Sequence, residues 1–275
     1  MAQKMSKGKG PDNAVHLYGI SPVMQCLLHN SRKCQTLYVK EKGSARIGEV
    51  EELARKRNLP VRRVDAHRLG LLAGTKRHQG VVLACGELKI NTLDDFLRSG
   101  TELPKKLLVA LDRLEDPQNV GAIVRTAAFL GASGLITVGK RVPPLGSTVS
   151  KASAGALEHF PIFQAPNLAE CLAKLKREAF SIVGSSSDGS TDFRATPITD
   201  YMVLVLGNEG QGLRRLTQDR CDHIVRIPGA RSFDSLNVGA ACAILLQHLA
   251  QRIFQPRPAG SEMEKLQKID ATICR

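Results

Sequence analysis

The sequence predicts an α/β protein of two domains, and three observations lead to that class. Helical and extended patterns alternate along most of the chain. The strands of the second part are nearly continuous apolar runs, which is typical of a parallel sheet covered by helices on both faces. A polar stretch at residues 88–106 separates a small first unit from a larger second one. The chain has 275 residues, of which 43% are hydrophobic, enough for two cores.

The first unit is expected at residues 14–87, after a flexible basic arm at residues 1–13. Its pattern predicts, in order, a helix from about residue 21, a strand at 36–40, a polar helix at 48–58, an extended segment at 59–65 and a strand at 78–86. Residues 88–106 are expected to be a linker that carries one short helix capped by Thr92.

The second unit is expected at residues 107–255, followed by a loosely attached polar tail at residues 256–275. Strands are predicted to alternate with helices along it. The strands are expected at 106–112, 134–139, 180–186, 201–207 and 223–229, and the helices at 119–132, 151–159, 167–179, 212–221 and 235–254.

The charge is unevenly distributed and points to a polyanionic partner. The formal net charge is +13, and residues 1–106 hold 20 Lys and Arg against 10 Asp and Glu. Such an excess favours RNA, since each neutralised phosphate releases counterions, although solubility alone is the alternative explanation. The chain has no Trp and only 4% aromatic residues. Few aromatic side chains are therefore available to stack on bases, and we expect the protein to recognise RNA through its phosphates and its shape.

Cysteine usage indicates a reducing compartment, and we expect a cytoplasmic protein. The seven cysteines include no pair at CxxC spacing, so no metal site is expected. Apolar runs are broken by Gly, Pro or charge before they reach the length of a membrane span, so no membrane association is expected. The basic start has no apolar segment behind it, which is unlike a secretory signal.

Polar side chains gather at three predicted strand-to-helix turns, where open parallel sheets bind ligands. In the first turn, "DRLEDPQNVGAIVR", Asn119 is a natural N-cap and Gly121 permits close backbone approach. Arg125 follows about a turn and a half into the helix, where a solvated face is the structural alternative.

The second turn, "LGNEGQGL", sets Glu209 among Gly207, Gly210 and Gly212. It matches neither phosphate-binding glycine motif, and an acid there suits a cationic or hydroxyl-bearing ligand better. The third turn, "SFDSLNVG", places Ser235 and Asn237 at the opening of the last apolar helix, Ser235 being a possible N-cap.

Taken together, the order and spacing of these motifs resemble the SpoU (TrmH-like) branch of the SPOUT RNA 2'-O-methyltransferases. The shared motifs are N-x-G-x-x-x-R, then L-G-N-E-G-x-G, then I-P followed by S-L-N-V. The first unit is similar to the L30e/L7Ae-like substrate-binding domain of that family. Its "YGISPV" and "RHQGVV" match the versions found in enzymes that act on a guanosine of large-subunit rRNA. The resemblance implies a trefoil knot in the second domain.

The resemblance also implies S-adenosylmethionine as cofactor and a homodimer whose active site lies at the subunit interface. The helix from Ser235 and the helix of Asn119 are then the expected contact surfaces. The residues that the resemblance assigns to catalysis are Asn119, Arg125, Glu209, Ser235 and Asn237, and those it assigns to cofactor binding are Gly207, Asn208, Glu209, Gly210, Ile227 and Leu236. Gly239 departs from the family pattern, which usually has Ser at that position.

Other functions remain open at the level of the sequence. A tRNA ribose methyltransferase of the same family is the main alternative, and a non-catalytic RNA-binding assembly factor is another. A nicotinamide-dependent enzyme is disfavoured because no GxGxxG follows a strand. RNA and a second copy of the chain are the expected partners, and DNA is not expected.

Overall fold

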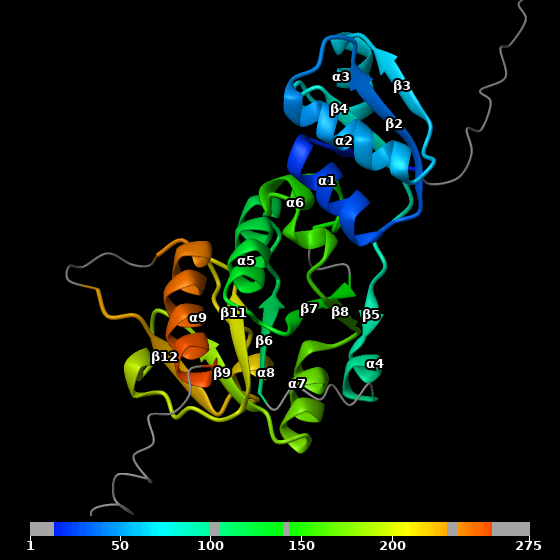
Figure 1. Cartoon of the computed structure of the whole chain (residues 1–275). Coiled ribbons are helices and arrows are strands. Elements are labelled where there is room, and N and C mark those ends of the chain that lie inside the picture. Colours follow the sequence, from blue (N-terminus) through cyan, green and yellow to red (C-terminus); the bar gives the residue numbers. More distant parts are fainter. Residues whose placement is uncertain (1–13, 99–104, 140–142, 230–235, 255–275) are drawn as a thin grey trace, which may run out of the picture.

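The structure is a computed structural model that describes residues 14–98, 105–139, 143–229 and 236–254 (Figure 1). The predicted arm at 1–13, the predicted tail at 256–275 and Ser235 lie outside these residues. Within the described ranges, no helix combines the length and apolar character that crossing a membrane requires.

The first domain is a four-stranded sheet in the order β1-β4-β2-β3. β4 is antiparallel to both β1 and β2, whereas β2 and β3 are parallel. Its elements are β1 (Val15–Tyr18), α1 (Ile20–His29), β2 (Cys34–Lys40), α2 (Ala45–Lys56), β3 (Val61–Val64), α3 (Ala66–Ala73) and β4 (Val81–Cys85). Alternate strand residues, such as Leu37 and Leu83, pack with Val23 of α1 and Val50 of α2 into one core.

The second domain is built on a parallel sheet in the order β10-β12-β9-β11-β6-β7-β8-β5. Its strands are β5 (Asn91–Thr92), β6 (Lys106–Asp112), β7 (Gly134–Val138), β8 (Ile162–Ala165), β9 (Ser181–Ser185), β10 (Thr191–Asp192), β11 (Tyr201–Gly207) and β12 (His223–Arg226). Its helices are α4 (Leu93–Arg98), α5 (Pro117–Phe129), α6 (Ser147–Ala152), η2 (Ala156–Glu158), α7 (Leu168–Arg177), η3 (Phe193–Ala195), α8 (Arg215–Gln218) and α9 (Val238–Phe254).

Both faces of this sheet are buried, which explains the continuous apolar runs in its strands. Leu107 and Val109 of β6 pack into a core shared with α5 and α9. Leu108, between them, points into a second core shared with α4 and α7. Successive residues of a strand face opposite sides of the sheet, so a strand covered on both sides is apolar throughout. The predicted α/β class is confirmed.

The structure differs from the expected elements at several places, and two of them affect how the domains are joined. Within the stretch expected to be a linker, β5 pairs with β8 and α4 packs into the larger domain. The short helix there is capped by Thr92 as predicted, since its Oγ1 accepts from the Asp95 amide at 3.1 Å. The single helix expected at 151–159 is instead α6 followed by η2. Gly155 separates them with a φ of +90°, which interrupts a helix.

The first domain rests on α6 and η2, which follow the carboxyl end of β7 (Figure 1). Its α1 contacts both of these elements, and β1 contacts α6. On their other side, α6 and η2 contact α5. The first domain is therefore linked through α6 to the helix that carries Asn119 and Arg125.

A Gly121→Ala substitution tests the contact between α5 and α6. A Cβ at Gly121 would lie 2.3 Å from the Ala152 Cβ and 2.9 Å from the Ser153 amide nitrogen, so the helices must move apart. We expect the free energy of unfolding to fall by about 1–3 kcal/mol, measured by urea denaturation. Gly48→Ala is the control, because a Cβ there meets nothing within 4 Å. Equal stability of the Gly121→Ala variant and the wild type would contradict this packing.

Candidate active site

The three polar turns meet around one carboxylate oxygen within a single subunit. Glu209 Oε1 accepts from Asn119 Nδ2 at 3.0 Å and from Asn237 Nδ2 at 2.8 Å. It also accepts from the backbone amide of Val238 at 3.2 Å. Asn237 Nδ2 donates to Asn119 Oδ1 as well, at 2.9 Å. Segments 118 residues apart in sequence thus form one polar cluster at the carboxyl ends of β6 and β11. We call Asn119, Glu209 and Asn237 the polar cluster.

Asn237 has two tasks, one at each end of its amide. Its Oδ1 accepts from the Gly239 amide at 2.9 Å and from the Ala240 amide at 3.3 Å, so Asn237 is the N-cap of α9. The last helix begins at Val238, so the expectation that it begins at residue 235, with Asn237 inside it, is wrong. Glu209 adds a negative charge at the same helix N-terminus, where the helix dipole favours it.

Asn119 is not the N-cap that its residue type suggests. Asp116 caps α5, because its side chain accepts from the Gln118 amide at 3.0 Å. Pro117 occupies the first helical position, where its missing N–H costs nothing. The Asn119 side-chain amide is consequently available to donate to Glu209. Gly121 permits the close backbone approach that was expected, since a Cβ there would lie 2.9 Å from the Ser153 amide nitrogen.

The turn at residues 207–212 closes tightly on itself. The Asn208 amide donates to the Gly212 carbonyl at 3.2 Å, and the Gly212 amide returns a bond of 2.8 Å to the Asn208 carbonyl. Gly207 is required, since a Cβ there would lie 2.4 Å from the Gly212 carbonyl carbon. Gly212 has a φ of +61°, which favours glycine. Asn208 Oδ1 accepts from the Gly210 amide, which fixes the backbone beside Glu209.

Asp112 stabilises the chain that follows this turn, and the sequence motifs do not include it. It ends β6 with 0% exposure and accepts from Arg214 at two atoms, the backbone amide at 2.9 Å and Nε at 2.7 Å. This ion pair ties the chain after the turn to the neighbouring strand. An acid at the end of a buried apolar strand is the signal that could have identified it.

Arg125 lies apart from the polar cluster. It is exposed on α5, and no described residue forms a hydrogen bond or ion pair with its side chain. It follows Asn119 by six positions, so the two side chains project about 120° apart around the helix. Arg125 therefore faces outward beside Ala122 and Phe129, which are exposed on the same helix.

The residues assigned to the cofactor belong to the turn after β11 and to the segments before α9, and they differ in exposure. Gly207 is buried, Asn208 and Ile227 are half-buried, and Glu209, Gly210 and Leu236 are exposed. A close backbone turn, an acid and two accessible aliphatic side chains together fit a donor that has a cationic sulfonium and an aromatic base.

Two family models match the chain and together cover most of it. Residues 106–247 match the SpoU rRNA Methylase family, and residues 16–90 match the domain described as RNA 2'-O ribose methyltransferase substrate binding. The chain belongs to the SpoU rRNA methylase family. It is an S-adenosylmethionine-dependent RNA methyltransferase with a substrate-binding domain in front of the catalytic one.

Individual relatives agree with this assignment. The chain is 37% identical over 242 residues to the 23S rRNA (guanosine-2'-O-)-methyltransferase RlmB of Neisseria meningitidis serogroup B, covering 87% of this chain and 96% of that protein. It is 34% identical to the putative TrmH family tRNA/rRNA methyltransferase YacO of Bacillus subtilis, covering 82% and 91%. The AdoMet-bound rRNA methyltransferase from Sinorhizobium meliloti superposes with a TM-score of 0.72 at 28% identity, covering 89% of each chain.

Proposed function

We propose that the protein transfers a methyl group from S-adenosylmethionine to the 2'-hydroxyl of a guanosine in large-subunit rRNA. The polar cluster formed by Asn119, Glu209 and Asn237 is the observation that carries the proposal. The substrate is supported by the relative that methylates a 23S rRNA guanosine, which matches along 87% of this chain. The basic first domain, which matches a substrate-binding model, supplies charge for RNA phosphates.

The donor, when bound, supplies an activated methyl group on a sulfonium. The protein must then align the ribose hydroxyl and assist the loss of its proton. We assign to Arg125 the binding of a neighbouring phosphate and the stabilisation of the alkoxide that develops on the ribose. Asn119, Glu209 and Asn237 orient the ribose, and the assignment of Ser235 to the same task rests on the family resemblance.

The donor would be held by the tight turn and the segments beside it. The backbone of Gly207, Asn208 and Gly210 offers polar contacts close to the Glu209 carboxylate. Ile227 and Leu236 offer apolar surface, Leu236 being 49% exposed. Part of the proposal is that the second domain is knotted in its C-terminal half. The return of the chain from β12 to the turn after β11, where the Val238 amide meets Glu209, supports this.

The protein is further proposed to act in the cytoplasm as a homodimer that pairs through the outer faces of α5 and α9. These helices contact each other, and Phe129 on α5 is 87% exposed. Ile244 and Phe254 on α9 are each 40% exposed. Pairing there would cover these side chains and bring Arg125 of α5 to the interface, close to the site of a second copy.

A Phe129→Asp variant tests the pairing surface. A carboxylate buried in the centre of an apolar interface is strongly disfavoured, so we expect the dimer to dissociate at micromolar concentration. Light scattering coupled to size-exclusion chromatography measures the mass directly. Leu71→Asp is the control, because Leu71 is 62% exposed on α3 of the first domain. A wild-type protein that elutes as a monomer would rule out the dimer.

The substrate is tested by incubating the protein with labelled S-adenosylmethionine and transcripts of large-subunit rRNA and of tRNA. We expect label in the rRNA, on the 2'-oxygen of one guanosine, located by resistance to alkaline cleavage. Label in tRNA alone would favour the alternative ribose methyltransferase, and a methylated base would overturn the reaction. Absence of S-adenosylmethionine binding in calorimetry would favour a non-catalytic assembly factor.

A further inference from the structure

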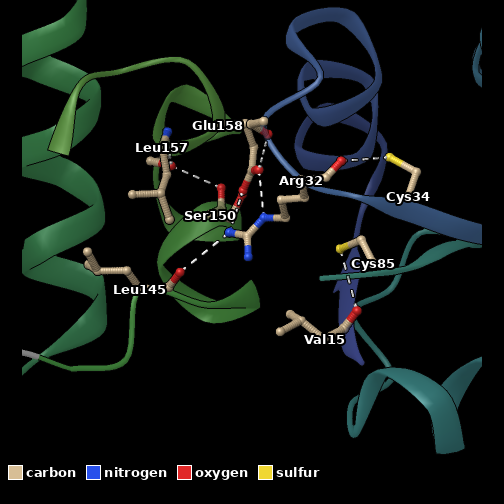
Figure 2. A network of polar contacts seen from close by, with 10 residues as sticks. Val15, Arg32, Cys34, Cys85, Leu145, Ser150, Leu157 and Glu158 are labelled. Atoms are coloured by element: carbon tan, nitrogen blue, oxygen red, sulfur yellow. Dashed lines mark hydrogen bonds and ion pairs between the residues drawn. The ribbon is translucent and has the colours of Figure 1, made fainter. Parts of the chain in front are cut away.

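A buried ion pair joins the two domains. Arg32, just before β2 in the first domain, forms a two-point contact with Glu158 of η2 in the second domain (Figure 2). Arg32 Nε lies 2.8 Å from Glu158 Oε2, and Nη2 lies 2.9 Å from Oε1. Both side chains are almost fully buried, with 1% and 0% of their surface exposed. The planar guanidinium matches the carboxylate in one relative orientation only.

The remaining polar groups around the pair are also satisfied from both domains. Ser31 Oγ of the first domain donates to Glu158 at 2.7 Å, and Ser150 Oγ of α6 donates to it at 2.8 Å. Arg32 Nη2 also reaches the Leu145 carbonyl at 3.4 Å (Figure 2). Burial opposes the charge of Arg32, but the hydrogen bonds and charge of Glu158 outweigh it, so the pKa of Arg32 is raised.

Close backbone packing surrounds the ion pair. A Cβ at Gly155 would lie 2.8 Å from the Ser21 carbonyl oxygen and 2.8 Å from the Gln25 side chain, both on α1. Lys151 Nζ of α6 also donates to Gln79 Oε1 of the first domain. The two domains are therefore in direct contact at further points besides the ion pair, and the arrangement does not depend on the connecting segment alone.

The segment that carries Glu158 packs on α5, the helix that carries the proposed catalytic residues. Ser150 and Glu158 belong to the α6–η2 segment, and α6 packs so closely on α5 that Gly121 has no room for a side chain. Gly121 lies two residues after Asn119 and four before Arg125 on the same helix. The α6–η2 segment therefore lies between the first domain and α5, and it fixes the orientation of the first domain relative to α5.

We propose that Arg32 and Glu158 are positioning residues, which hold the substrate-binding domain in the orientation that presents one ribose of the bound RNA to the polar cluster. This rests on the proposed function, because it assumes that RNA contacts both domains. Replacing a buried ion pair by apolar groups is often neutral for stability, so the two-point geometry of this pair, and not its contribution to stability, is the basis of the proposal. Displacement of a substrate by about 1 Å can reduce the rate about a hundredfold, so a fixed domain orientation matters for turnover.

The test compares Arg32→Met, Arg32→Lys and the double variant Arg32→Met with Glu158→Gln in the full chain. On a long rRNA transcript that reaches both domains, we expect kcat/KM of Arg32→Met to fall at least tenfold. Arg32→Lys, which keeps the charge without the two-point geometry, should fall less. The double variant leaves no unpaired buried charge, so it should fold like the wild type yet keep the kcat/KM defect. The Kd for S-adenosylmethionine should stay within twofold in all three.

The matched control is Lys56→Met, which removes an ion pair within the first domain. Lys56 and Glu52 are 68% and 65% exposed, so their loss should leave kcat/KM unchanged. Small-angle X-ray scattering of each variant without RNA reports the domain arrangement independently of activity. We expect Arg32→Met and the double variant to show a wider range of interdomain distances than the wild type.

Two results would overturn the proposal. One is a folded double variant with wild-type kcat/KM on the long transcript, and the other is unchanged scattering of Arg32→Met. Should the wild type methylate no rRNA at all, the proposed function fails, and the scattering comparison still decides whether this pair fixes the domains. A third arm uses a short transcript that reaches only the second domain. A purely stabilising role predicts a lower unfolding temperature together with equal losses of kcat/KM on the long and the short transcript, which would also overturn the proposal.

Discussion

An Arg125→Ala variant should lose methyl transfer at least about a hundredfold, or about 3 kcal/mol of transition-state stabilisation. The side chain is exposed and has no hydrogen-bonding or ion-pairing partner among the described residues, so its removal costs the fold little. Its guanidinium is then available for an RNA phosphate and for the negative charge that develops on the ribose oxygen. Single-turnover assays with saturating rRNA and labelled S-adenosylmethionine measure the rate.

Cofactor affinity separates this role from a role in binding the donor. We expect calorimetry to give a Kd for S-adenosylmethionine within about twofold of the wild type, because Arg125 lies outside the polar cluster. Arg177→Ala is the control. Arg177 is exposed in the last turn of α7, which packs on the face of the sheet opposite α5. An Arg125→Ala enzyme with wild-type turnover would remove Arg125 from the mechanism.

A Gly207→Ala variant should lose S-adenosylmethionine binding and some stability. A Cβ at this position would lie 2.4 Å from the Gly212 carbonyl carbon and 2.6 Å from the Leu213 amide nitrogen. Both atoms are backbone, so no rotamer change relieves the overlap and the turn must open. We expect the Kd to rise at least tenfold and the free energy of unfolding to fall by about 1–3 kcal/mol.

Gly210→Ala provides the contrast within the same turn. Its Cβ would meet only Asn208 Oδ1 at 3.6 Å, an ordinary contact. We therefore expect a smaller loss of affinity than for Gly207→Ala, and calorimetry combined with thermal unfolding compares the two. If Gly207→Ala bound the donor as tightly as the wild type, the closed form of the turn would not be needed for binding.

The class of fold could be predicted because the longer strands of the second domain are continuous apolar runs in the sequence. In β6 and β11 every residue from the second onward is buried, and such runs are typical of strands covered by helices on both faces. The short β8 was missed because its four residues follow an irregular segment broken at Gly155. Two-residue strands such as β5 carry too little pattern to be detected.

The sequence predicts which polar turns form the site, but it does not predict which of their side chains cap the helices. Asp116 and Asn119 are both capping residue types, and the choice between them depends on Pro117, which sets the first helical position. Asn237 was placed inside its helix because Ser235 offers an equally good capping side chain in the sequence. The prediction that the polar turns meet rests on the family motifs and on the rule that ligands bind at the carboxyl ends of parallel strands.

The pairing of Arg32 with Glu158 could not have been predicted. These residues are 126 positions apart, and neither belongs to a motif. Each alone would be interpreted as a solvated surface charge, since Arg and Glu are rarely buried unless paired. Only the docking of one domain on the other brings them together.

The ends of the eight-stranded sheet have a consequence for the addition of foreign strands. Both outermost strands, β10 and β5, are only two residues long. Each boundary therefore presents few free amide and carbonyl groups to which a foreign chain could add. This geometry disfavours the pairing of one sheet with the edge of another, so the proposed contact between two copies is through helices.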